Sequence, residues 1–486
     1  MNKDTNSLEL HNGKSKIKGK KVLKKTTKFW KSNPAAKTPF TIIPSKLSKW
    51  LEQQGYYSIS TFGEQQIVQL IKNVAHIKSP MEVYNDALEY VKRENNEILE
   101  DCFRTQGENL LLSKKGTLGT VQKLTLKRYK DTEKRVRVFF QNTIVEISSK
   151  GNKNASYESL KSLDSYIFYD QIVKRDFIVK KNLKGDFKSF LEKITNSSKH
   201  FLSVCTAIGY VISNFKNPSL AKAVIITDIL SQVKNEAYGR SGKGIVIKAI
   251  SEIINVVEYN GKVTDLANDK FVFQNVDITT ALIVLQDVTK GFVFESLFST
   301  LTDTMSIERK HRSKIAIPFN ESAKIALTTN YTIPQDTDSF RDRKQLVMLN
   351  NFFNANNKPE KYFKTLLFHW SKKEWQRFDN FMLECVRLFL EKGLVNYSDE
   401  KFELQRLINQ TSEEFIALME SDYDYLNHFF SLKKIAEKLT IEGINVSVKS
   451  KIVKKWCNDY AAHKGYQIEE AKNGGYYKIC FRPRPN

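Results

Sequence analysis

Residues 237–244 read AYGRSGKG, a glycine-containing run that ends in a lysine and one more glycine. Upstream lies the short apolar segment 223–229, rich in β-branched residues, and segment 244–250 continues the run with a helical pattern. A buried strand, a glycine-rich loop, a lysine and a helix together bind nucleotide phosphates, because backbone N–H groups and the helix N-terminus face the anion. The residues predicted to contact the nucleotide are Gly239, Ser241, Gly242, Lys243 and Gly244.

Two further apolar segments each end in a polar residue. Segment 281–287 ends in Asp287, and segment 323–330 ends in Asn330. Ligands of open α/β sheets bind at the carboxyl ends of the strands, so Asp287 is predicted to meet the Mg²⁺ that accompanies the nucleotide. Asn330 can orient the attacking water near the γ-phosphate without adding negative charge. After these segments, Arg341 and Arg343 supply guanidinium groups of the kind that act as arginine fingers.

A basic segment lies between the second and third of these elements. Residues 306–314 read SIERKHRSK, and the alternating segment 315–319 follows them. With residues 305–307 on the other side, the pattern predicts a β-hairpin whose tip holds residues 309–312. Such a tip is either a solvated turn or, in an ATPase that moves along nucleic acid, a contact to phosphates.

In combination, these elements resemble the superfamily 3 helicases, hexameric AAA+ motors of viruses, phages and plasmids. Residues 306–311 look like the pore hairpin of papillomavirus and polyomavirus replicative helicases, and residues 187–394 resemble the helicase part of phage and plasmid primase-helicases. The segments that carry the resemblance are 242–244, 286–288, 295–299, 306–311, 327–331 and 375–394.

The resemblance implies a role for each matching residue. Lys243 would bind the phosphates, Asp287 the metal or water, and Asn330 would act as the sensor. Arg343, or else Arg341, would reach the nucleotide of the neighbouring subunit. The residues implied or predicted to contact single-stranded DNA in the pore are Arg309, Lys310 and His311.

Two positions depart from the family pattern, and both affect the metal. Gln286 stands before Asp287, where family members commonly carry a second acidic residue, and Gly244 lacks the hydroxyl that normally binds Mg²⁺. Mg²⁺ keeps several waters and can be held by one carboxylate together with phosphates. The sequence therefore leaves two alternatives open: an active ATPase, or a protein that binds nucleotide with slow or no turnover.

Composition indicates a nucleic-acid partner. The chain carries 77 lysines and arginines against 54 acidic residues, a formal net charge of +23, which suits binding to a polyanion. Part of this charge is local, because no acidic residue occurs between Glu9 and Glu52. We predict a disordered basic tail over residues 1–39, which would raise DNA affinity by counterion release.

The sequence shows no membrane span and no cysteine framework. No stretch reaches the 18 or so apolar residues that cross a bilayer. The five cysteines are scattered, odd in number and without zinc-ligand spacing, which indicates a reducing compartment. We therefore expect a cytoplasmic protein associated with the bacterial nucleoid.

We predict an α/β protein with an AAA+ type P-loop core and two flanking domains. An accessory α+β domain is expected over 40–180, with helices at 46–54 and 81–100 and an edge strand at 135–140. The domains predicted after it are the ATPase core over 187–354, a helical extension over 355–430 whose aromatic residues line a core, and a winged-helix-like domain over 431–486.

The last of these domains is basic, with two helices expected at 432–439 and 449–463 and a hairpin around 473–475. Relatives of the helix-turn-helix place the second helix on duplex DNA, so Lys451, Lys454 and Lys455 are DNA-binding candidates. A protein contact is the alternative.

The function predicted from these observations is an ATP- and Mg²⁺-dependent DNA helicase that replicates a phage, plasmid or integrated element. It would act as a homo-hexamer on single-stranded DNA, with a separate primase as a further partner. One alternative is a replication initiator or loader that uses ATP to assemble on duplex DNA. The other is a DNA-binding protein with a degenerate nucleotide site, which Gln286 favours.

Overall fold

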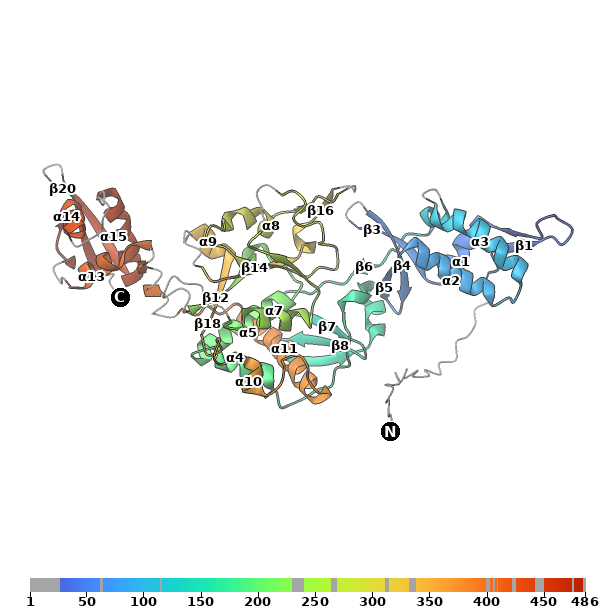
Figure 1. Ribbon diagram of the computed structural model, residues 1–486, viewed down its shortest axis with the longest axis horizontal. Helices are drawn as coiled ribbons and strands as arrows, with labels where there is room; N and C mark the ends of the chain where they lie inside the picture. Colours follow the sequence, from blue (N-terminus) through green and yellow to red (C-terminus); the bar gives the residue numbers. More distant parts are fainter. Residues whose placement is uncertain are drawn as a thin grey trace, which may run out of the picture. The chain divides into compact units, whose positions relative to one another are not determined.

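The computed structural model describes residues 27–61, 64–113, 116–229, 240–263, 269–310, 314–331, 338–398, 403–404, 407–408, 410–421, 425–441, 450–473 and 476–483. The chain forms two compact units. The first comprises Met1–Ile59, Gln66–Ile71 and His76–Leu124, and the second comprises Ser60–Gln65, Lys72–Ala75 and Thr125–Asn486. Figure 1 shows several separate sheets and many helices, which confirms the predicted mixed α/β class.

The first unit begins earlier than the sequence predicted. Strand β1 pairs antiparallel with β2, and Phe29 and Trp30 are buried beside Trp50 and Phe103 in one aromatic core. The folded part therefore includes residues that we had assigned to the basic tail. The early elements are β1 (Trp30–Ser32), β2 (Phe40–Ile42), α1 (Pro44–Gln53), β3 (Tyr56–Thr61), β4 (Glu64–Ile71), β5 (Val74–Lys78), α2 (Pro80–Lys92) and α3 (Glu97–Leu112).

The helix predicted at 81–100 is two helices, α2 and α3. Asn95 adopts a positive φ of 51°, which ends the α-helical path, and the Asn96 side chain then accepts a hydrogen bond from the Leu99 N–H to cap α3. Ser79 and Glu82 form a capping box at the start of α2. The predicted helix at 46–54 is confirmed by α1.

A small sheet precedes the main one, and it corrects two expectations. Its order is β11-β7-β8-β9, so β7, predicted as an edge strand, is paired on both sides. Val136, Val138 and Phe140 of β7 share one core with the large parallel sheet, so the structure places no domain boundary at residue 180. The elements of this region are β6 (Lys127–Arg128), β7 (Val136–Phe140), β8 (Ile144–Ser148), β9 (Gly151–Ala155), β10 (Ser165–Phe168) and β11 (Ile172–Val173).

The central sheet of the second unit has five parallel strands in the described residues. They are β12 (Ala223–Asp228), β13 (Val256–Asn260), β14 (Leu282–Val288), β17 (Lys324–Thr329) and β18 (Lys344–Leu349). Numbered by their order along the chain, the strands run 5-1-4-3-2 from β18 to β13. Strand β12 thus lies between the fourth and fifth strands, and the chain order reverses beside it, as it does at ligand sites of open α/β sheets.

Both faces of this sheet are covered, which explains the continuous apolar character of its strands. Alternate residues such as Val224 and Ile226 pack on one face with helices α5, α7 and α11, while Ile225 and Leu327 pack on the other with Phe294 and Phe340. The helices around the sheet are α4 (Asp186–Lys193), α5 (Ser198–Ile212), α7 (Lys243–Ser251), α8 (Phe298–Thr302), α9 (Asp338–Arg343), α10 (Pro359–Phe363) and α11 (Lys372–Lys392).

Helix α11 belongs to the same core, so the predicted helical extension is not a separate domain over its first part. Its Phe378 and Phe381 are buried in the core of the sheet together with Met382, which confirms that these two aromatic side chains serve packing. Gly209 of α5 lies so close to the Cys385 backbone that any side chain there would overlap it.

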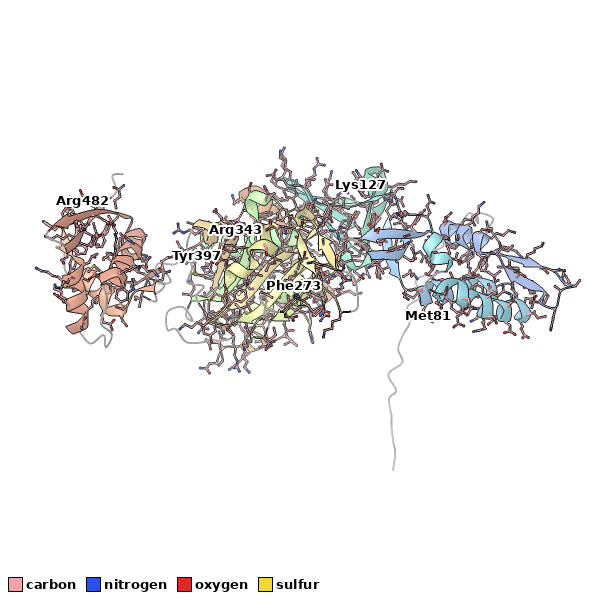
Figure 2. The ribbon with its side chains drawn as sticks, turned by 90° about the horizontal axis from the view of Figure 1, so that it is seen from above. Met81, Lys127, Phe273, Arg343, Tyr397 and Arg482 are labelled. Atoms are coloured by element: carbon pink, nitrogen blue, oxygen red, sulfur yellow. The ribbon has the colours of Figure 1, made fainter. Side chains whose placement is uncertain are left out.

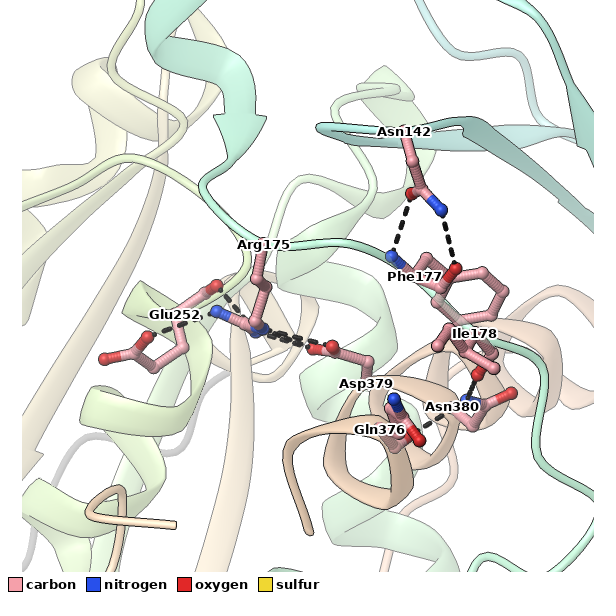
Figure 3. Close-up of polar contacts among 8 residues, drawn as sticks. All are labelled: Asn142, Arg175, Phe177, Ile178, Glu252, Gln376, Asp379 and Asn380. Carbon is pink, nitrogen blue, oxygen red and sulfur yellow. Dashed lines mark hydrogen bonds and ion pairs between the residues drawn. The ribbon is translucent and has the colours of Figure 1, made fainter. Parts of the chain in front are cut away.

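An ion pair ties the segment after β11 to two helices (Figure 3). The Arg175 guanidinium donates to Asp379 of α11, with Nη2 2.6 Å from Oδ1, and Nη1 lies 3.4 Å from Glu252 Oε2, while its plane packs on Trp375. Burial raises the pKa of Asp379, and the charge of Arg175 opposes this rise. Because Glu252 is the C-cap residue of α7, this cluster joins α7 to α11.

A buried lysine lies at the amino end of β17 in the central sheet. Lys324, the first residue of β17, donates to the backbone oxygen of Tyr210 and, at 2.6 Å, to that of Ser213, at the end of α5. A cation suits the carboxyl end of a helix. Burial nevertheless lowers the pKa of Lys324 to about 7. The buried Asp131 accepts from the backbone N–H of Asn214 and Arg137, and burial raises its pKa to about 6.

The C-terminal residues form a body with its own apolar cluster. The predicted order of two helices and a hairpin is confirmed, and a short strand precedes them in the sheet order β19-β21-β20. The elements are α13 (Glu413–Ser421), β19 (Phe430–Ser431), α14 (Leu432–Ile441), α15 (Ser450–Lys464), β20 (Tyr466–Asn473) and β21 (Tyr476–Pro483). Among the described helices, none combines the length and the apolar character that a bilayer crossing requires.

Candidate functional site

The glycine before Lys243 is required by the backbone. Gly242 is the N-cap of α7 with a φ of 100°, in the left-handed region that favours glycine, and a side chain there would also overlap the Phe190 ring of α4. Helix α7 begins at Lys243, so the predicted strand and helix are present as β12 and α7, while residues 230–239 between them lie outside the described part of the chain. Gly239 lies outside the described residues.

The Lys243 ammonium lies where two neighbouring strands end. It forms an ion pair with the Asp228 carboxylate, the last residue of β12, and lies 2.6 Å from the amide oxygen Oδ1 of Asn330, directly after β17. The Ser241 hydroxyl is 3.5 Å away. Lys243 is 7 % exposed and Asp228 1 %. The structure therefore brings together three predicted residues, Ser241, Lys243 and Asn330, with one carboxylate that we had not predicted as functional.

Asp287 occupies a strained position at the end of β14. The ladder between β14 and β17 shifts register between Leu285 and Val288, and Asp287 has a φ of 54°. Its backbone N–H donates to the Thr328 hydroxyl at 2.8 Å. A bulge of this kind re-aims a side chain, and positive φ outside glycine concentrates at functional sites.

The carboxylate of Asp287 is not among the groups bonded to Lys243. It is half exposed and lies 3.9 Å from the Lys262 ammonium, and no hydrogen bond or ion pair among the described residues joins it to Lys243. The amide of Gln286 donates to the carboxylate of Glu258 on the neighbouring strand β13. The Gln286 amide thus contacts a second carboxylate, Glu258, in addition to Asp287 beside it in the sequence.

The two predicted arginine fingers both lie in the last turn of α9, in different surroundings. The Arg343 guanidinium (labelled in Figure 2) donates to the Ser339 hydroxyl at 2.7 Å and packs 4.7 Å from the centroid of the Phe298 ring. Arg341 is exposed, and its backbone oxygen accepts from the Lys222 ammonium at 2.7 Å. Arg343 is thus held within its own subunit.

The predicted β-hairpin is confirmed. Strands β15 (Met305–Ile307) and β16 (Ile315–Ile317) pair antiparallel, and their inward residues join an apolar cluster with Ile283 of β14. His311 lies outside the described residues, whereas Lys310 is exposed near the Phe271 ring. The Arg309 guanidinium donates to the Val276 backbone oxygen at 2.9 Å, so this side chain contacts the body of the protein.

The three lysines predicted on the second C-terminal helix differ in exposure. Lys451 and Lys455 of α15 are exposed, but Lys454 forms an ion pair with Glu470 of β20 at 2.7 Å. The Lys454 ammonium also lies 5.7 Å from the centre of the Tyr477 ring.

Asp228 is a residue of this candidate site that the sequence did not single out. The predicted strand 223–229 contains Asp228 next to its last residue, and the argument that singled out Asp287, a carboxylate at the carboxyl end of a strand, applies to it equally. The described residues contain no group of three or more histidine, cysteine or acidic side chains that could hold a metal ion.

Comparisons with known proteins leave the family open. No protein-family model matches the chain, and no curated protein matches it. Solved apo structures of the NrS-1 C-terminal region align over 90 % of this chain and 98–99 % of theirs, with 13–14 % identical residues and TM-scores of 0.43, 0.40 and 0.44. TM-scores this low do not establish a common fold.

Proposed function

We propose that the parallel sheet and α7 form an AAA+ type P-loop site that binds ATP with Mg²⁺ and hydrolyses it. The observation that carries this proposal is the convergence of Lys243, at the N-terminus of α7, with the ends of β12 and β17. A helix N-terminus and an ammonium at the carboxyl edge of a parallel sheet attract phosphate.

Each residue of this edge has a proposed task. Lys243 would neutralise the outer phosphates, the backbone of Ser241 and Gly244 would line them, and Asn330 would orient water. The half-exposed carboxylate of Asp287 offers the oxygen ligand that Mg²⁺ prefers. When bound, Mg²⁺ would neutralise charge that develops on the phosphates.

We further propose that the ATPase is a DNA helicase of superfamily 3 type, acting as a homo-hexamer in the replication of a phage, plasmid or integrated element. The exposed Lys310 on a hairpin anchored to the sheet, and the net charge of +23, support a nucleic-acid substrate. His311 and Arg309 would flank this contact, and a separate primase would be a partner.

The arginine finger offers a test of the ring. Arg341 is the more exposed of the two arginines of α9, and we propose it as the finger that reaches a neighbouring nucleotide. Mixing Arg341→Ala subunits with Lys243→Ala subunits should restore part of the ATPase activity that each variant lacks. An interface between an intact loop and an intact finger can form only in the mixture.

The measurement is ATP hydrolysis across mixing ratios, with mixed rings verified by differently tagged subunits. The same series with Arg343→Ala is the matched control, and it should show no trans rescue if Arg343 supports α9 within its own subunit. Mixed rings without recovery for either arginine would contradict a finger acting in trans.

A second candidate function is a replication initiator or loader with a slow nucleotide site. Gln286 is bonded to Glu258 and Asp287 lies beside Lys262, so the metal site is weaker than in a protein with two adjacent acids. The exposed Lys451 and Lys455 on a winged-helix-like body suit duplex DNA. Sequence-specific duplex binding without strand separation would favour this candidate.

A further inference from the structure

The carboxylate of Asp228 pairs with the ammonium of Lys243, the positive charge that nucleotide phosphates would otherwise contact. Asp228 ends β12 and is buried, and its ion pair with Lys243 lies beneath the N-terminus of α7. An ammonium has three N–H donors, and three oxygens surround this one: those of Asp228, Asn330 and, at 3.5 Å, Ser241. The protein itself thus satisfies the Lys243 ammonium.

Such a pair has two physical consequences. Removing one partner of a buried ion pair leaves an uncompensated charge, which is strongly destabilising. A carboxylate beside the lysine also opposes the approach of phosphate, because like charges repel strongly where water is excluded. Both consequences follow from Asp228 and Lys243 and need no metal.

We propose that Asp228 is a positioning residue that holds Lys243 in the empty site and competes with nucleotide phosphates for its charge. This inference rests on the proposed function. The pair would re-form as the outer phosphate leaves, so Asp228 would speed the release of ADP. It would also keep the buried lysine compensated between turnovers.

Nucleotide affinity tests the competition. In the full-length protein with EDTA present, Asp228→Asn should bind ATP and ADP on the order of ten-fold more tightly than the wild type, because one opposing charge is gone. The dissociation rate of ADP should fall in parallel. Titration calorimetry and stopped-flow chase of a fluorescent ADP measure the two quantities.

Asp303→Asn is the matched control. It removes an exposed carboxylate at the end of α8, which is not among the groups bonded to Lys243. Without Mg²⁺ it should leave nucleotide affinity nearly unchanged. Weaker binding of Mg²⁺-free nucleotide by Asp228→Asn would overturn the competition, since Asp228 would then support the bound state.

Stability tests the pair without any nucleotide. In the wild type, Asp228→Asn should lower the midpoint of thermal unfolding, because it leaves the buried Lys243 ammonium without its ion-pair partner. In Lys243→Met, the same change should raise the midpoint, because it removes a buried carboxylate that has already lost its partner. This reversal of sign is expected only if the two charges compensate each other. Equal effects in both backgrounds would overturn the pairing, and the Lys243→Met background keeps the test decisive if Asp228→Asn alone fails to fold.

The two tests separate this inference from the proposed function. If the wild type binds neither ATP nor ADP, the proposed function and the competition both fail, while the stability reversal still decides whether Asp228 holds Lys243. If the wild type binds both nucleotides and Asp228→Asn binds them no more tightly, the nucleotide site stands and the competition is wrong.

Discussion

Lys243→Ala should abolish ATP hydrolysis, with a loss of at least about 10²-fold in turnover, because it removes the positive charge aimed at the outer phosphates. Lys243 is the first residue of α7, and its ammonium lies at the converging ends of β12 and β17. Nucleotide-driven assembly of the ring should be lost with it. The measurements are steady-state phosphate release and sedimentation velocity with and without ATP.

The structure adds a condition to this experiment. Lys243→Ala leaves the buried Asp228 without its partner ammonium, so the variant should also unfold at lower temperature. Lys243→Ala with Asp228→Asn removes this penalty and should still be inactive. Hydrolysis at the wild-type rate by either folded variant would contradict the assignment of the nucleotide site.

Lys310→Ala with His311→Ala should eliminate strand separation and the stimulation of hydrolysis by single-stranded DNA. Basal hydrolysis should persist, because β15 and β16 form a hairpin separate from the Lys243 site. Loss of the lysine contact should also reduce the salt dependence of single-strand binding, by about one unit of slope or less per phosphate contact.

The measurements are strand displacement, ATPase activity and single-stranded DNA binding across a salt series. Lys372→Ala with Lys373→Ala is a suitable control, because it removes two exposed charges at the start of α11, away from the hairpin. It should leave strand displacement intact. Normal displacement by the hairpin variant would remove the main reason to regard this protein as a helicase.

The strands whose carboxyl ends form the candidate nucleotide site could be predicted, because strands buried on both faces are continuous apolar runs in the sequence. Apolar, β-branched runs placed β12, β14 and β17 within one or two residues of where they lie. Their order across the sheet could not be predicted, because β12 pairs with β17 and β18, which lie far along the chain. The contact between Lys243 and Asn330 depends on that order, because Asn330 follows β17, which pairs with β12.

Other expectations failed for local reasons. The alternation at 135–140 predicted an edge strand, but Arg137 pairs with Glu146 of the neighbouring strand at 2.6 Å, so its charge is satisfied inside the sheet. The lysine-rich composition of the first residues predicted a tail over 1–39, although Phe29 and Trp30 pack in the first core. The bulge at Asp287 leaves no sequence signal, because neither a glycine nor a proline marks it.

The measurement that tests the central claim most directly is single-turnover ATP hydrolysis by the wild-type protein, with and without single-stranded DNA. The proposed function predicts Mg²⁺-dependent cleavage of bound ATP that single-stranded DNA accelerates and duplex DNA does not. Bound ATP that stays intact under both conditions, in a protein that still binds DNA, would contradict it and identify a degenerate nucleotide site.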